Sequence, residues 1–157
     1  MAKDTPSMAK NKIRRSLTAI LDPYPTAKET DDLWLYFNSC CAYCGVHIER
    51  ASRIGHMDHL VSSAFGGSNG IHNHVLSCSR CNGDEKREED WQIFLEQKAA
   101  TPEIAATRRS QIMNWLAKAS PRALGPDMDR RVAVIIQTAL ASYDHAVEQI
   151  RALRKGA

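Results

Sequence analysis

The apolar residues of this 157-residue chain recur at helical spacing towards both of its ends and lose that period in between. Near the start, Ile13, Leu17 and Ile20 fall on one face of a helix. Later in the chain, further runs of apolar residues at helical spacing are bounded by charged and turn-forming residues, which are typical of helix ends. The pattern predicts helices over residues 7–21, 30–38, 84–98, 102–117 and 127–153.

The middle of the chain has a different character. Cysteines, glycines and histidines replace the helical period between residues 39 and 73, and the glycine-rich run at 66–70 is typical of a loop. Short apolar stretches at residues 53–61 and 75–77 predict two strands around that loop. The chain is therefore expected to combine a small β-structure with flanking helices in an α+β fold.

The composition of the chain excludes only a few classes of protein. With 43% apolar residues the chain can build one ordinary core, and no apolar run is long enough for a membrane span or a signal-peptide core. We therefore expect a cytoplasmic protein without a membrane partner. Its net charge of +3 is too small to indicate a nucleic-acid partner by itself.

Positive charge is concentrated near the N-terminus, at Lys10, Lys12, Arg14 and Arg15. A basic arm that binds DNA phosphates would have this composition, and so would a solvated basic tail. Both interpretations stay open on the sequence alone.

Two Cys-x-x-Cys pairs carry the clearest chemical signal. Cys41 and Cys44 form the first pair, and Cys78 and Cys81 form the second. Each pair can present two thiolates to one tetrahedral zinc, so one structural Zn²⁺ per chain is predicted. A redox Cys-x-x-Cys is the main alternative, but no βαβ pattern surrounds either pair. The fifth cysteine, Cys40, is expected to be a free thiol.

The segment between the pairs is longer than the roughly 15–20 residues of a plain zinc ribbon, and five of the six histidines lie between His47 and His74. The run that begins at Cys41 and ends at Lys86 resembles HNH endonucleases with a zinc-stabilised ββα-metal core. The resemblance covers about residues 39–90 and rests on both cysteine pairs together with Gly45, Asp58, His59, Gly66, Gly67, Asn73, Asn82 and Lys86.

The resemblance implies a ββα-metal core with a four-cysteine zinc site, and the helical pattern places N- and C-terminal helices on either side of it. We expect a basic N-terminal arm with helices (1–38), the HNH core (39–98) and a C-terminal helical extension (99–157), all within one compact domain. The resemblance also implies an endonuclease that acts on double-stranded DNA, with the loop at 66–70 against the minor groove.

The roles of individual residues follow from the same resemblance. His59 would be the general base, Asn73 would tie down the loop behind it, and Asp58 with Asn82 would hold a catalytic Mg²⁺ or Mn²⁺. These residue types suit the reaction, because an imidazole can accept a proton near neutral pH and carboxylate and amide oxygens are hard ligands.

Adjacent residues of a strand point to opposite faces, so we expect a bend where Asp58 meets His59. We also expect a backbone carbonyl to orient the His59 ring. His56 is a further candidate contact for metal or phosphate. Arg80 and Lys86 could bind DNA phosphates, although a charged run such as the one around Lys86 also suits a solvated helix face.

Two other classes of function stay open. A catalytically silent zinc module that only binds nucleic acid would need the cysteines but not the trio of Asp58, His59 and Asn82. A zinc domain for protein interaction could form a homodimer through the C-terminal helix, whose apolar stripe over residues 127–153 would equally suit packing on its own core.

Overall fold

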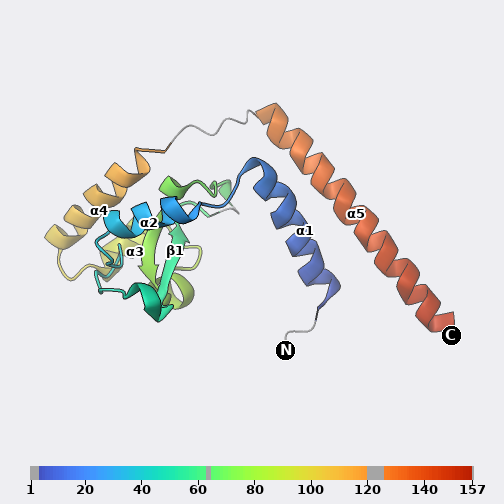
Figure 1. Ribbon diagram of the computed structural model, residues 1–157, viewed down its shortest axis with the longest axis horizontal. Helices are drawn as coiled ribbons and strands as arrows, with labels where there is room; N and C mark the ends of the chain where they lie inside the picture. Colours follow the sequence, from blue (N-terminus) through green and yellow to red (C-terminus); the bar gives the residue numbers. More distant parts are fainter. Residues whose placement is uncertain (1–3, 63–64, 120–125, 157) are drawn as a thin grey trace. The chain divides into compact units, whose positions relative to one another are not determined.

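The computed structural model describes residues 4–62, 65–119 and 126–156 (Figure 1). It divides the chain into two units, which are described separately. One unit joins α1 (Pro6–Leu21) to α5 (Pro126–Gly156), and the other covers residues 24–121. The boundaries expected from the sequence lie at 38/39 and 98/99 instead. The difference arises because α2 and α4 contact the central β-structure and so belong to the same unit as the cysteines.

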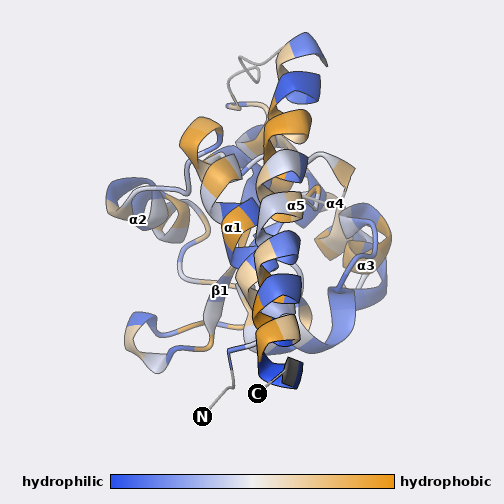
Figure 2. Ribbon diagram, turned by 90° about the vertical axis from the view of Figure 1, so that its right-hand side faces the viewer, coloured by the Kyte–Doolittle hydropathy of each residue, from blue (hydrophilic) through white to orange (hydrophobic). Residues whose placement is uncertain are grey.

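The first unit consists of two packed helices. Thr5 caps α1 by accepting a hydrogen bond from the backbone N–H of Met8 (3.3 Å), and Pro6 opens the helix. Lys10 on α1 forms an ion pair with Asp144 on α5 at 2.9 Å. In Figure 2 apolar residues recur along α5 among hydrophilic ones.

The two sides of α5 differ in burial. Ile136 and Leu140 are buried, whereas Ile135, Ile150 and Leu153 are exposed. The homodimer expected through this helix stays a prediction, and light scattering of the full chain tests it. No helix in the described part of the chain combines the length and apolar character needed to cross a membrane.

The second unit opens with α2 (Ala27–Tyr36), which begins three residues before the predicted start. Thr26 caps this helix: its hydroxyl accepts from the backbone N–H of Glu29, and the Glu29 carboxylate accepts in turn from the backbone N–H of Thr26 at 2.8 Å. These hydrogen bonds lower the pKa of Glu29. The helix buries Leu33 and Trp34.

A two-stranded antiparallel sheet forms the centre of this unit. Strand β1 (Gly55–His59) pairs with β2 (His74–Cys78), in a register that runs from Gly55↔Cys78 to His59↔His74. The absence of a side chain at Gly55 lets α2 approach, since a Cβ there would lie 2.5 Å from the Trp34 ring. The short helices η1 (Arg50–Ser52) and η3 (Ile71–Asn73) precede the two strands.

The segment after β2 departs from the predicted single helix over 84–98. It forms η4 (Arg80–Lys86), which has π-helical hydrogen bonding, and then α3 (Trp91–Lys98), which Asp90 caps. Arg87 separates the two helices with a φ of 49°. Helix α4 (Pro102–Leu116) follows as predicted, with its cap at Thr101.

This arrangement confirms the predicted α+β class: a two-stranded sheet and a helix with a four-cysteine cluster at their junction. The core of the unit surrounds the sheet, with Phe94 and Leu95 from α3 and Ile112 and Trp115 from α4 among its buried side chains. Trp115 also donates its ring N–H to the backbone carbonyl of His74 at 2.8 Å. The helices thus fix the position of the second strand.

Candidate functional site

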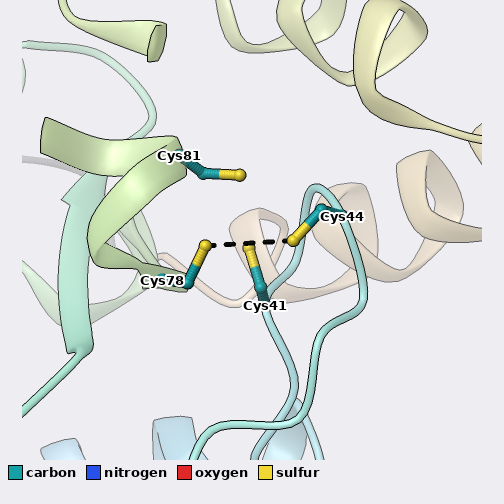
Figure 3. A group of neighbouring side chains, drawn as sticks. All are labelled: Cys41, Cys44, Cys78 and Cys81. Atoms are coloured by element: carbon teal, nitrogen blue, oxygen red, sulfur yellow. Dashed lines mark hydrogen bonds between the residues drawn. The ribbon is translucent and has the colours of Figure 1, made fainter. Parts of the chain in front are cut away.

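The four cysteines predicted to bind zinc converge at one point. Cys41 and Cys44 lie on the loop after α2, Cys78 ends β2, and Cys81 lies in the first turn of η4 (Figure 3). Their Sγ atoms all lie within 4.8 Å of one another, and those of Cys44 and Cys78 are 3.9 Å apart. A tetrahedral zinc with bonds of about 2.3 Å places its sulfurs roughly 3.8 Å apart. The cluster therefore fits a structural Zn²⁺ in both donor type and spacing.

The electrostatics of the cluster also favour a bound cation. A hydrogen bond with Cys81 lowers the pKa of Cys41 to about 4, with help from nearby backbone N–H groups. The same hydrogen bond raises the pKa of Cys81 well above its ordinary value, and burial raises that of Cys44 to about 11. Four thiolates at this spacing repel one another unless a cation neutralises them.

Helix α4 contacts the loop that carries Cys41 and Cys44 through the side chain of Arg108. Arg108 donates from Nη1 to the backbone carbonyl of Tyr43 at 2.6 Å. Its guanidinium passes so close to Gly45 that a Cβ there would lie 2.0 Å from Nη2, and Gly45 has a φ of 76°. The free thiol of Cys40 lies outside the cluster and contacts the backbone carbonyl of Asn38 at 3.3 Å.

Asp58, on β1, is buried between two donors. The Tyr43 hydroxyl donates to its Oδ2 at 2.6 Å, and the Lys86 ammonium lies 3.2 Å from the same oxygen. Burial raises the pKa of Asp58, while the charge of Lys86 and the hydrogen bond of Tyr43 act in the opposite direction. Lys86 is itself only 4% exposed, so its position does not suit the phosphate contact expected from the sequence.

His59 is half-buried and ends β1, directly after Asp58. Its ring lies against that of His74, with centroids 4.0 Å apart, and its Nε2 is 3.4 Å from Asn69 Oδ1. The pairing of β1 with β2 continues through both Asp58 and His59, so the bend expected between them is not observed. The expected backbone-carbonyl partner is instead found at His74, whose Nδ1 donates to Gly70 at 3.0 Å.

Asn73 holds the glycine-rich loop. Its amide oxygen accepts from the backbone N–H of Val61 at 3.0 Å, and its Nδ2 donates to the backbone carbonyls of Val61 and Ser68 at 2.9 and 2.8 Å. Gly67 fits closely under this network, because a Cβ there would lie 1.8 Å from the Val61 carbonyl oxygen. These contacts are those of a residue that ties down a loop.

Comparison with protein families identifies this segment. Residues 41–88 match the HNH endonuclease family. This segment is therefore similar to HNH endonuclease domains. The match begins at Cys41 and ends two residues after Lys86, so it includes both cysteine pairs together with Asp58, His59 and Asn73. No curated protein matches the chain.

The remaining candidate residues differ in exposure. Asn82, on η4, is half-buried and lies four residues before Lys86, about one helical turn away. His56 is exposed on β1, two residues before Asp58 and thus on the same face of the strand. Arg80 is exposed and paired with Glu85 at 2.8 Å. On α1, in the other unit, Lys12, Arg14 and Arg15 are exposed.

Sequence reasoning missed the buried partners of Asp58 and His59. Nothing in the sequence distinguishes Tyr43 from any other large residue between the two cysteines of a Cys-x-x-Cys pair. The position of Lys86 does carry a weak signal, because it lies one turn after Asn82 and so shares a helix face with a predicted site residue. Among the described residues, the cysteines are the one group of three or more acidic, histidine or cysteine side chains able to hold a metal.

Proposed function

We propose that the HNH domain is an endonuclease that hydrolyses phosphodiester bonds in double-stranded DNA, with His59 as the general base. The observation that carries the proposal is the position of His59: a half-buried imidazole at the end of β1, next to Asp58, within a segment that matches HNH endonucleases. In this role the imidazole takes the proton of the attacking water. Asn73 and Gly67 hold the loop behind it.

Asp58 and Asn82 are the residues that would hold the catalytic cation. A carboxylate and an amide oxygen are the donors that Mg²⁺ and Mn²⁺ prefer, so the donor set fits. When bound, such a cation would stabilise the charge that develops on the phosphate and the leaving oxygen. The Tyr43 hydroxyl orients the Asp58 carboxylate, which also has Lys86 as its counterion.

We assign DNA contacts to exposed basic residues that take no part in the proposed catalysis. Arg80 and the basic residues of α1, among them the exposed Lys12, Arg14 and Arg15, would bind phosphates, and their contribution would fall with salt. His56 is a further contact for cation or phosphate. The loop at residues 66–70 would lie against the minor groove. The zinc holds the cysteine loop to the sheet and so supports the site without touching the substrate.

The test is a cleavage assay on supercoiled plasmid DNA with and without Mg²⁺. The wild-type chain is expected to cut only with the cation, and His59→Ala should lose cutting while it still binds DNA. His145→Ala is the matched control, because His145 lies on α5, outside the HNH domain. A His59→Ala protein that cuts at the wild-type rate contradicts the proposal. A wild-type protein that binds DNA but never cuts supports the silent zinc module instead.

A further inference from the structure

We infer that Lys86 is a positioning residue of the HNH site, whose ammonium occupies the Asp58 carboxylate and competes there with the divalent cation. The inference rests on the proposed function in one respect, because it takes Asp58 as a ligand of that cation. It adds to the proposed function that Lys86, the counterion of Asp58, competes with that cation.

The contacts of Lys86 tie η4 to the end of β1. Its Nζ lies 3.2 Å from Oδ2 and 3.4 Å from Oδ1 of Asp58, and it also donates to the backbone carbonyl of His59 at 3.0 Å. A single ammonium thus holds two consecutive residues, the proposed cation ligand and the proposed base. Both side chains of the ion pair are buried, at 4% and 7% exposure.

Burial favours this pairing in the absence of another cation. An isolated charged carboxylate or ammonium in a protein interior is strongly unfavourable, so each charged partner stabilises the other. Lys86 supplies one positive charge to Asp58 from within the chain. The site can therefore be neutral and ordered before any divalent cation arrives.

The same ammonium opposes cation binding. Lys86 contacts both carboxylate oxygens, so a divalent cation that binds Asp58 must displace it or accept a positive neighbour. Either event lowers the affinity of the site for the cation. Removal of the lysine charge should therefore tighten cation binding, an effect that a purely structural residue would not produce.

Lys86→Met tests this, since methionine keeps most of the side-chain length and removes the charge. In isothermal titration of the zinc-loaded full chain with Mn²⁺, the variant should bind about tenfold more tightly than the wild type. Lys98→Met is the matched control: Lys98 also pairs with a carboxylate of η4, that of Glu85, but lies outside the site. Its Mn²⁺ affinity should equal that of the wild type. Unchanged or weaker binding by a folded Lys86→Met protein overturns the inference.

If Lys86→Met is too unstable for titration, the effect of Mn²⁺ on the unfolding temperature tests the same inference. That variant leaves Asp58 without its counterion, so Mn²⁺ should raise its unfolding temperature more than it raises that of the wild type. The double variant Asp58→Asn with Lys86→Met has neither charge and should not respond to Mn²⁺. An equal response of the wild type and Lys86→Met contradicts the competition.

The outcomes separate this inference from the proposed function. Neither measurement uses DNA cleavage, so tighter Mn²⁺ binding by Lys86→Met supports the competition even if no variant cuts DNA, in which case only the nuclease proposal fails. A wild type that cuts DNA, together with a Lys86→Met protein of unchanged Mn²⁺ affinity, overturns the role of Lys86 alone.

Discussion

His59 and His74 are direct partners in the two-stranded sheet, and their rings lie 4.0 Å apart at an angle of 52°. His74 is almost fully buried, and its Nδ1–H is fixed by the carbonyl of Gly70. A carbonyl only accepts hydrogen bonds, so this contact also fixes the His74 tautomer. The buried His74 ring is therefore held in place, and its packing against the half-buried His59 ring orients that ring.

Replacement of His74 should impair the action of His59 as a base and leave DNA binding unchanged. His74→Ala removes this packing contact, and the resulting misplacement of the His59 ring should reduce the cleavage rate by roughly 10- to 100-fold. His74→Phe retains a ring of similar shape and should recover part of that loss. Single-turnover cleavage and DNA-binding assays measure the two effects separately. Equal rates for the Ala and Phe variants would show that ring packing does not orient His59.

The zinc cluster should be essential for the fold of its unit. Cys78→Ser removes one of four ligands and is expected to lose both the metal and the folded structure, since two strands and a short helix bury little surface alone. Metal analysis should find one zinc per wild-type chain, and circular dichroism should report the unfolding. Cys40→Ser should retain the zinc, because Cys40 lies outside the cluster. A folded, metal-free protein lacking all four ligands would contradict this assignment.

Features that depend on residues close in sequence were predictable. The Cys-x-x-Cys pairs, the helix ends at Asp22-Pro23 and Thr101, and the loop at residues 66–70 each carry their own local signal. The HNH resemblance then placed Asp58, His59, Asn73 and Asn82 in one segment, and the family match at residues 41–88 confirms that segment.

Contacts between distant segments were not predictable in the same way. The ion pair of Asp58 with Lys86 depends on how η4 packs on β1, and the charged run around Lys86 suggested a solvated face. The break at Arg87 likewise carries no glycine or proline signal. A backbone carbonyl was expected to orient His59, but the carbonyl of Gly70 accepts instead from His74, on the strand opposite His59.

Gly67 should tolerate no side chain. In Gly67→Ala the new Cβ would lie 1.8 Å from the Val61 carbonyl oxygen and 2.9 Å from Asn73 Nδ2, so the loop must move. Such a clash costs about 1–3 kcal/mol of unfolding free energy, and the shifted loop should also slow cleavage. Gly83→Ala is the control, because no atom lies within 4 Å of the added Cβ. Chemical denaturation of both variants measures the difference, and equal stability would show that the loop adapts freely.

Asn82 and His59 should respond differently to added metal. Asn82→Ala removes a proposed cation ligand, so its cleavage activity should recover as Mg²⁺ or Mn²⁺ is raised, and calorimetry should show weaker Mn²⁺ binding. His59→Ala removes a base that acts only in the transition state, so it should lose roughly 10²- to 10⁴-fold in rate at every metal concentration while its Mn²⁺ affinity stays unchanged. Asn114→Ala, on the exposed surface of α4, should match the wild type in both assays. An Asn82→Ala protein with wild-type metal dependence would remove Asn82 from the cation site, and rescue of His59→Ala by metal would place His59 there instead of at the attacking water.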